Sequence, residues 1–291
     1  MLLFFCKTVA CLPLSWVHQL GAFFGWLSYL TDKKSNGIAL ANIQQSGLAA
    51  DDAQARQLVK TSRIEAGKAL METFFIWGSP AAKLLPLIQQ VHGWEHVTAA
   101  QAQKRGLIFL TPHLGCFEIT SIYYGERAPI TVLYRPPKLE WLSELVVKGR
   151  EKGKVEMAPA NASGVKKLLQ SLKSGLAIGI LPDQIPRQGE GEWADFFGKP
   201  AYTMGLASKL ASKADAVVIM AFGERLPAGK GFNIHLTRVD DISTPTLLNQ
   251  AIERQVAQCP AQYLWQYNRH KQRRYAMHKL EKAQPDLAER E

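Results

Sequence analysis

The chain lacks the cysteine patterns that would indicate disulfides or a zinc ribbon. Its four cysteines are Cys6, Cys11, Cys116 and Cys259, and no two of them form a Cys-x-x-Cys pair. A chain of 291 residues can bury a core without disulfides, and unpaired cysteines are typical of a reducing compartment. We therefore expect free thiols in a protein whose main domain faces the cytoplasm.

Internal repeats, low-complexity tracts and Gly/Ser-rich linkers are also lacking. The hydrophobic content of 47% excludes a disordered chain, and one large domain is the simplest organisation. Acidic residues are fewer than basic ones: the chain has 25 aspartates and glutamates and 35 lysines and arginines, which gives a net charge of +10. This excess predicts an anionic partner. Nucleic acid, anionic lipid and an acidic carrier protein all meet that condition.

The amino-terminal segment has almost no charge. Between Met1 and Leu30 the only charged residue is Lys7, and aromatic residues typical of membrane interfaces are frequent. A helix that crosses the hydrocarbon layer needs about 20 apolar residues, and here Pro13, His18 and Gln19 interrupt the run. No Ala-x-Ala cleavage site follows, so the segment does not have the pattern of a secretory signal.

Two parts of the chain are therefore expected. Residues 1–31 are predicted to form a membrane-anchoring hydrophobic helix that dips into or spans the membrane once, with a buried core helix as the alternative. Lys33 and Lys34 directly after it indicate that residues 32–291, the main domain, stay on the cytoplasmic side.

Short apolar runs alternate with helical patterns through the main domain. Helical periodicity is found over residues 55–78, 140–151, 163–174 and 203–213. Runs typical of strands lie at residues 107–110, 130–133, 176–181, 216–220 and 232–236. This alternation predicts an α/β fold with a mainly parallel central sheet flanked by helices. Ligands of such sheets bind beyond the carboxyl ends of the strands.

One candidate base stands at such a strand end. Pro112 stops the run that starts at Leu107, and His113 follows it directly. If Gly115 bends the backbone, Glu118 in the first turn of the next helix can reach back to the imidazole. A carboxylate that holds one ring nitrogen leaves the other free to act as a general base. Spacing alone is a weak signal, and an unrelated histidine and glutamate are the alternative.

Further blocks make a resemblance specific. The segment from Thr111 to Glu118 resembles the His-x-x-x-x-Asp/Glu motif of lysophospholipid-type acyltransferases. Six other blocks resemble one branch, the lipid A biosynthesis (lauroyl/myristoyl) acyltransferases, and occur in its order: Tyr134–Lys138, Met157–Ala160, Gly164–Leu169, Gly179–Gln184, Phe196–Pro200 and Tyr263–Arg269. The likeness covers nearly the whole chain. The Phe-Pro-Glu-Gly-Thr-Arg block of the glycerolipid branch is absent, and Leu139 departs from the family pattern.

The resemblance implies a fold of the glycerolipid-acyltransferase kind and a specific reaction. A fatty acyl chain would pass from acyl carrier protein to a hydroxyl of a lipid A precursor in lipopolysaccharide or lipooligosaccharide biosynthesis. His113 would be the general base and Glu118 its orienting partner. Neither a metal nor an organic cofactor is expected, because a thioester donor is already activated. The expected location is the bacterial inner membrane, with the catalytic domain on the cytoplasmic side.

Four further residues are predicted to bind substrate. Arg135 would bind a phosphate or the developing oxyanion, and an ordinary surface arginine is its alternative. Asp183 and Gln184 end the third strand, where they would bind the acceptor or simply cap a turn. Arg269 closes the last block of the resemblance and is assigned to the substrate on that basis alone.

Competing interpretations remain open. Cys116 is a candidate covalent nucleophile, although cysteine is a common buried residue. His92 and His96 have the spacing of zinc ligands, but the motif glutamate and a third ligand are missing. The basic run from Asn268 to Arg274, with aromatic residues around it, is compatible with nucleic acid, although we favour lipid phosphates or an acidic carrier. The sequence is also compatible with a hydrolase, with a phospholipid acceptor and with a non-enzymatic basic binding protein.

Overall fold

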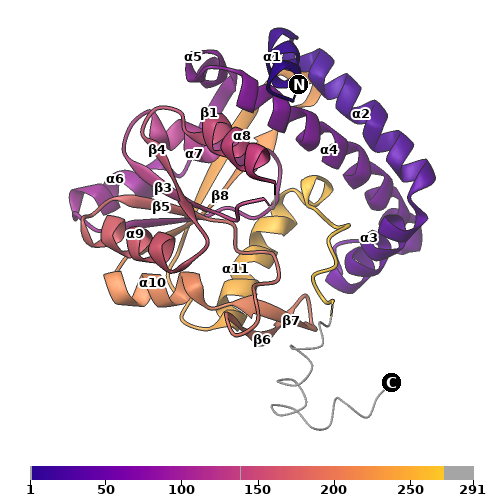
Figure 1. Cartoon of the computed structure of the whole chain (residues 1–291). Helices are drawn as coiled ribbons and strands as arrows, with labels where there is room; N and C mark the ends of the chain where they lie inside the picture. The colour runs from indigo at the N-terminus through magenta and orange to yellow at the C-terminus, as the bar shows by residue number, and fades with distance from the viewer. Residues whose placement is uncertain (1, 138, 272–291) are drawn as a thin grey trace.

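The structure is a computed structural model and describes residues 2–137 and 139–271. Its centre is a seven-stranded sheet with the strand order β1-β9-β8-β2-β5-β3-β4, and a two-stranded hairpin, β6-β7, lies apart from it (Figure 1). Within the large sheet, β8 and β9 pair antiparallel, and the other pairs are parallel. The strands are β1 (Ile88–His92), β2 (Leu107–Leu110), β3 (Ile130–Tyr134), β4 (Val155–Pro159), β5 (Ala177–Ile180), β6 (Gly191–Phe196), β7 (Lys199–Met204), β8 (Val217–Arg225) and β9 (Phe232–Val239).

Helices cover both faces of the sheet. They are α1 (Leu2–Cys11), α2 (Leu14–Thr31), α3 (Lys33–Ser46), α4 (Asp52–Gly78), α5 (Ala81–Leu84), α6 (Trp94–Ala102), α7 (Phe117–Gly125), α8 (Glu140–Arg150), α9 (Ala162–Lys173), α10 (Leu206–Ala214) and α11 (Pro245–Gln258). Three short 3-10 helices, at Leu85–Leu87, Pro227–Gly229 and Pro260–Gln262, complete the connections. The predicted α/β fold with a mainly parallel sheet flanked by helices is confirmed.

Strand β2 lies at the centre of the sheet, and its side chains alternate between two hydrophobic cores. Leu107 and Phe109 belong to the core that includes residues of α1, α2, α4 and α7. Ile108 and Leu110 belong to the core that includes residues of α3, α9, α10 and α11. All four residues are buried, which is typical of a parallel strand covered on both faces. The carboxyl end of β2 is therefore fixed from both sides.

The amino-terminal segment differs from the expectation. The single helix predicted over residues 1–31 is wrong, because the segment forms two helices, α1 and α2. Pro13 separates them in an extended conformation with φ −60° and ψ 143°. Proline cannot donate the backbone hydrogen bond that would continue α1, and it starts a new helix well. Among the described residues, no helix is both long enough and apolar enough to cross a membrane.

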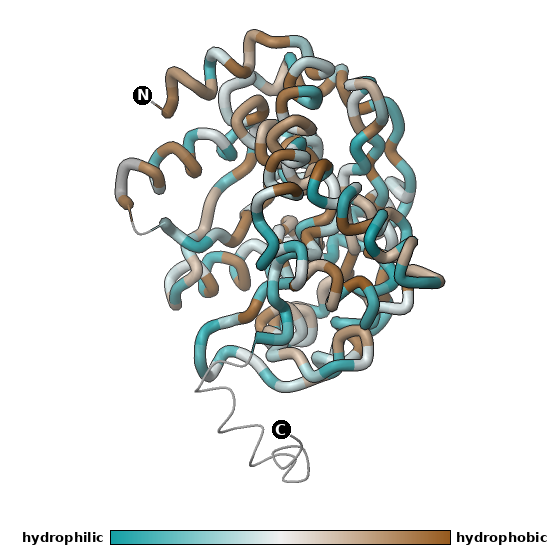
Figure 2. Tube along the Cα trace, turned by 90° about the vertical axis from the view of Figure 1, so that its right-hand side faces the viewer, coloured by the Kyte–Doolittle hydropathy of each residue, from teal (hydrophilic) through white to brown (hydrophobic). Residues whose placement is uncertain are grey.

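Glycines hold α2 tightly against α4. A Cβ atom at Gly67 of α4 would collide with the backbone of Gly21 and Gly25 in α2, and a Cβ at Gly25 would collide with α4 in turn. Small residues of this kind let two helix backbones approach closely. The other face of the two amino-terminal helices carries exposed apolar side chains, and Figure 2 shows hydrophobic residues along the helix at the amino terminus. The exposed residues are Leu3, Phe4, Phe5, Trp16, Leu20, Phe23, Phe24, Trp26, Leu27 and Leu30.

Candidate active site

The turn between β2 and α7 carries the candidate base as the sequence predicts. β2 ends at Leu110, and α7 starts at Phe117, so His113 lies in the connecting turn. Gly115 has a φ of +60°, and a Cβ atom there would collide with the carbonyl oxygen of Gly223. Only glycine combines that backbone conformation with that close approach. The turn thus depends on Gly115 for its shape.

His113 is held by Asp183, which follows β5. The Oδ1 atom of Asp183 lies 2.8 Å from Nδ1 of His113, and Oδ2 accepts a hydrogen bond of 2.9 Å from the backbone N–H of His113. An ionised carboxylate can only accept, so Nδ1 must donate, and Nε2 keeps its lone pair. The two residues meet because β2 and β5 are neighbouring parallel strands, whose carboxyl ends lie at the same edge of the sheet.

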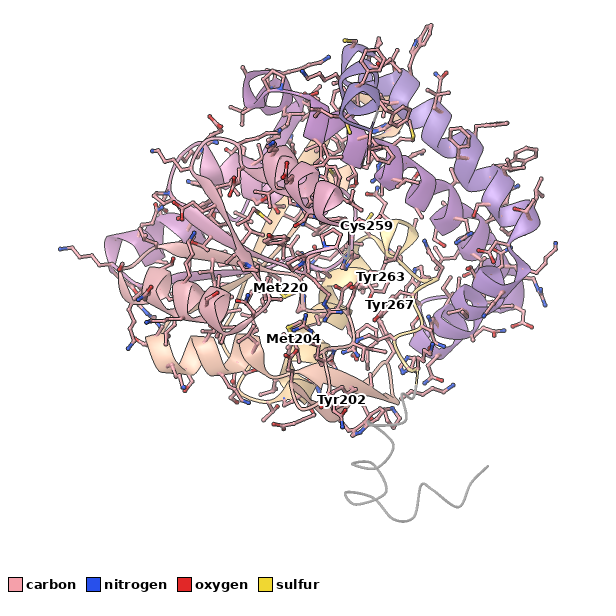
Figure 3. All side chains as sticks on the ribbon, viewed as in Figure 1. Tyr202, Met204, Met220, Cys259, Tyr263 and Tyr267 are labelled. Atoms are coloured by element: carbon pink, nitrogen blue, oxygen red, sulfur yellow. The ribbon has the colours of Figure 1, made fainter. Side chains whose placement is uncertain are left out.

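Asp183 is ionised in this setting. Its exposed fraction is 3%, and burial acts to raise its pKa. The facing His113 ring and the hydrogen bonds from His113 act in the opposite direction and outweigh burial, so the pKa of Asp183 lies below its ordinary value. The side chain of Tyr263, labelled in Figure 3, interacts with Asp183. Burial, and after it the charge of the Asp183 carboxylate, raises the pKa of this phenol well above its ordinary value. The phenol therefore stays neutral.

Glu118 has a different partner from the expected one. Its carboxylate accepts three hydrogen bonds from Arg150 at the end of α8, at 2.9, 2.9 and 2.6 Å. Within the described residues, no hydrogen bond joins Glu118 to His113, so the expected orienting contact is replaced by the one from Asp183. The first turn of α7 directs Glu118 towards α8, where a buried carboxylate requires a cation.

Two pockets meet at Phe117. A groove of about 310 Å³ beside His113 is lined by Ala66, Ala69, Leu70 and Thr73 of α4 and by the segment 262–264 with Gln266. A smaller pocket of about 30 Å³ lies under α7 and α8, where Glu118 and Arg150 face apolar residues of β2, β3 and β5. Phe117 lines both pockets, and its ring centroid lies 5.1 Å from that of His113. The groove offers the larger space for a substrate next to the imidazole.

The other predicted substrate-binding residues lie at different depths. Gln184 is partly exposed, and its Nε2 atom lies 3.3 Å from Nε2 of His113. Arg135 is exposed in the loop after β3. Arg269 is buried, with an exposed fraction of 2%, and it donates to the carbonyl of Tyr202 at 2.7 Å and to Oγ1 of Thr203 at 2.9 Å. This placement differs from the expected contact with substrate, because protein groups surround the Arg269 guanidinium.

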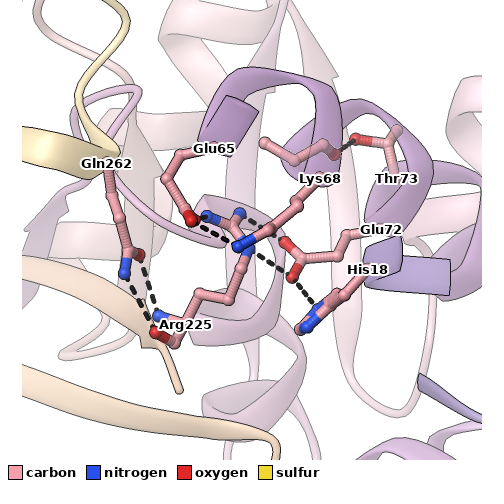
Figure 4. Close-up of polar contacts among 8 residues, drawn as sticks. His18, Glu65, Lys68, Glu72, Thr73, Arg225 and Gln262 are labelled. Carbon is pink, nitrogen blue, oxygen red and sulfur yellow. Dashed lines mark hydrogen bonds and ion pairs between the residues drawn. The ribbon is translucent and has the colours of Figure 1, made fainter. Parts of the chain in front are cut away.

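A buried ion network is formed by His18, Glu65, Glu72 and Arg225 (Figure 4). Arg225 at the end of β8 donates to both oxygens of Glu72, at 2.5 and 2.6 Å, and to Glu65 at 2.8 Å. His18 of α2 contacts the same Glu72 carboxylate at 2.6 Å. Burial opposes the charge on Glu72, but Arg225 and His18 outweigh it and lower the pKa of Glu72. The network joins α2, α4 and β8.

Gln262 connects the buried ion network to the turn that carries the base. Its side chain accepts from the backbone N–H of Arg225 and donates to the carbonyl of Arg225, both at 2.9 Å. The backbone carbonyl oxygen of Gln262 accepts a hydrogen bond from the N–H of Gly115 at 3.1 Å. The N–H of Leu264 donates to the backbone carbonyl of His113 at 3.2 Å. The sequence does not reveal this support, since its members are far apart in the chain.

The competing chemistries find little support in this geometry. Cys116 is buried, and desolvation followed by the charge of Glu72 raises the pKa of its thiol well above the ordinary value, which opposes a thiolate nucleophile. In the described part of the chain, no group of three or more His, Cys, Asp or Glu residues is arranged to hold a metal ion. His92 instead stacks on His235, with ring centroids 4.9 Å apart. Of the basic run 268–274, residues 272–274 lie outside the described residues.

Comparisons with known proteins agree with the resemblance seen in the sequence. A family model described as bacterial lipid A biosynthesis acyltransferase matches residues 1–272. The chain is similar to the lipid A biosynthesis lauroyltransferase of Escherichia coli (strain K12), at 25% identity over 276 residues, which cover 91% of this chain and 88% of the relative. It is similar to the lipid A biosynthesis palmitoleoyltransferase of the same organism, at 25% identity over 90% of this chain and 87% of the relative. A lipid A biosynthesis acyltransferase of Haemophilus influenzae (strain ATCC 51907 / DSM 11121 / KW20 / Rd) is 30% identical over 60% of this chain and 56% of its own length.

Proposed function

The chain belongs to the bacterial lipid A biosynthesis acyltransferase family, and we propose that it moves a lauroyl- or myristoyl-like chain from acyl carrier protein to a hydroxyl of a lipid A precursor. Family membership supports an acyltransferase that acts on a lipid A precursor. The carrier donor, the acyl chain and the base are our proposal. The observation that carries the proposal is the pairing of His113 Nδ1 with Asp183, which keeps the proton on Nδ1 and the lone pair on Nε2, in a residue that lines a groove.

The reaction follows from that pairing. The acceptor hydroxyl gives its proton to Nε2 of His113 while its oxygen attacks the carbonyl carbon of the thioester. The tetrahedral intermediate collapses, the C–S bond breaks, and the imidazolium returns the proton to the departing thiolate. Asp183 stabilises the imidazolium that forms between these two steps. No metal or organic cofactor is needed in this scheme, because the thioester supplies the activated acyl group.

The remaining site residues have supporting roles in this proposal. Glu118 and Arg150 fix α7 to α8 and so hold Phe117 next to His113. Arg135 is exposed on the loop after β3, where a guanidinium can bind a phosphate of the acceptor. Arg269 acts from behind the site, by fixing the backbone of Tyr202. The net charge of +10 favours an acidic carrier protein as the donor.

The test of the function is a direct transfer assay. Purified protein is incubated with carrier-bound acyl thioesters of several chain lengths and a tetra-acylated lipid A precursor, and the lipid is then weighed by mass spectrometry. We expect the precursor to gain the mass of one acyl chain, with a preference for one donor length. Heat-denatured protein is the control. Release of free fatty acid without acylated lipid would instead identify a hydrolase, and acylation of added phospholipid alone would identify a different acceptor.

We also propose that the protein binds the cytoplasmic face of the bacterial inner membrane through the exposed face of α1 and α2. Trp16, Phe23 and Phe24 have exposed fractions of 61%, 53% and 50%, and aromatic side chains of this kind bury well at a lipid interface. Replacement of each ring by serine removes roughly 1 kcal/mol of the free energy of transfer to the lipid interface. The triple variant, with serine at positions 16, 23 and 24, should therefore bind vesicles about 100-fold more weakly.

Flotation with vesicles of phosphatidylethanolamine and phosphatidylglycerol measures this binding. Leu176→Ser is the matched control, because Leu176 is an exposed apolar residue that lies outside α1 and α2. Equal flotation of the triple variant and the wild type would show that these aromatic side chains do not bind the membrane.

A further inference from the structure

Two consecutive residues contact the two nitrogens of the same imidazole. Asp183 holds Nδ1 of His113 at 2.8 Å, and the side-chain amide nitrogen of Gln184 lies 3.3 Å from Nε2. Both residues belong to the loop after β5, beyond Pro182. Nε2 is the atom that has to accept a proton in the transfer reaction, so in this structure the base nitrogen already has a partner.

The chemistry of the imidazole decides how this contact is made. Because Nδ1 donates to the ionised Asp183, Nε2 can only accept, and Gln184 must turn its NH₂ group towards it. A neutral imidazole has one lone pair at Nε2. A water molecule cannot give its proton to that lone pair while the amide of Gln184 occupies it. The cap therefore blocks the same atom that would activate water.

The contact is also weak enough to be displaced. At 3.3 Å it is longer than the usual 2.9–3.0 Å or so of a protein hydrogen bond. The Gln184 side chain is partly exposed, and it makes no other hydrogen bond within the described residues. It can therefore swing away without breaking a second contact. A cap of this kind is opened more readily by a ligand that binds the groove than by water.

We propose that Gln184 caps the base nitrogen of His113 until an acceptor hydroxyl displaces it, and that it thereby makes the site select a lipid hydroxyl over water. The inference rests on the proposed function and deepens it. In hydrolysis, water would attack the thioester carbon, give its proton to Nε2, and release a free acid and a thiol. Transfer follows the same steps with an alcohol, but the acceptor supplies binding energy that water lacks.

The test compares hydrolysis with transfer in Gln184→Met, which keeps the length of the side chain but has no N–H donor. Wild type and variant are incubated with a carrier-bound acyl thioester, with and without the lipid A precursor, and mass spectrometry follows the deacylated carrier and the acylated lipid. One neutral hydrogen bond supports an increase in hydrolysis of up to about tenfold, which corresponds to about 1.4 kcal/mol. Transfer should stay equal or fall. A role in folding alone would lower both rates together.

Two further variants complete the design. Gln188→Met is the matched control, because Gln188 is an exposed glutamine in the same loop and has no side-chain hydrogen bond in the described structure. Gln184→Ala repeats the test with a shorter side chain, in case the Met variant does not fold. If the wild type transfers the acyl chain but hydrolysis is unchanged or reduced in both Gln184 variants, the capping role of Gln184 is wrong and the proposed function still stands. Absence of any transfer by the wild type would overturn the proposed function, and the selecting role with it.

Discussion

Replacement of Asp183 by asparagine is expected to lower kcat by roughly 10⁴-fold. Asparagine fits the same space, but its NH₂ group can donate to Nδ1 of His113, where the carboxylate accepts a hydrogen bond of 2.8 Å. The ring then carries its proton on Nε2 and no longer has a lone pair at the atom that must take the proton of the acceptor. The loss should appear in kcat, with little change in KM, because the groove itself is unchanged.

Initial rates of acyl transfer at several acceptor concentrations measure this effect, and thermal unfolding shows whether the variant is folded. Asp215→Asn is the matched control, since Asp215 is exposed at the end of α10 and far from the groove in sequence and fold. A folded Asp183→Asn enzyme that loses less than about tenfold in kcat would exclude Asp183 as the orienting carboxylate.

The same carboxylate predicts how stability depends on pH. The pKa of Asp183 is lower in the folded protein than its ordinary value of about 3.9 in an unfolded chain. Its contribution to stability is thus fully present above about pH 4 and is lost as the pH falls through the lower folded value. Asp183→Asn should remove this part of the acid sensitivity, which unfolding curves of the two proteins between neutral and acidic pH would show.

Replacement of His113 by alanine is expected to lower kcat by roughly 10⁴- to 10⁶-fold, because no other described side chain beside the groove is positioned to take the proton. Gln184 can donate to an oxygen but cannot act as a base, and Cys116 is buried with a raised pKa. Binding of the acyl donor should persist, because the rest of the groove wall remains. Removal of the ring also leaves a space in which added imidazole can bind.

The measurement is the rate of transfer with and without free imidazole in the buffer. His92→Ala is the control, because His92 is exposed on β1 and stacks only on His235 among the described rings. Partial recovery of the His113→Ala variant by imidazole would support general-base chemistry directly. Activity above about 1% of the wild type without imidazole would assign the base to another group.

Much of the fold follows from local sequence. The apolar run at 107–110 becomes β2, and the run at 130–133 becomes the start of β3, because buried parallel strands are continuously hydrophobic. The turn after β2 is equally local, since Pro112 ends the strand and Gly115 allows the positive φ. Local sequence does not predict β1 and β4, because their short sequences mix polar and apolar residues.

The partners within the site cannot be derived in the same way. The sequence predicts that Glu118 faces His113, but the direction of its side chain depends on the phase of α7. Its partner Arg150 lies 32 residues further along the chain, at the end of α8. The sequence predicts that Asp183 lies at the end of a strand, but it does not predict the contact between Asp183 and His113. Its pairing with His113 requires β5 to be the neighbour of β2, and strand order is a property of the whole sheet. Arg225 and Glu72 are 153 residues apart, and no local pattern joins them.

The contact between His18 and Glu72 has a consequence for the design of shorter or more tractable forms of the protein. Deletion of α1 and α2 would remove a partner of a buried carboxylate and would expose the surface of α4 that Gly21 and Gly25 cover. That carboxylate is bonded to Arg225, and Gln262 in turn joins the backbone of Arg225 to the turn that carries His113. Exchange of outward-facing aromatic residues on these helices leaves every one of those contacts in place. A form of the protein that is easier to handle in aqueous buffer is therefore better made by replacing exposed aromatic residues of the first two helices than by deleting these helices.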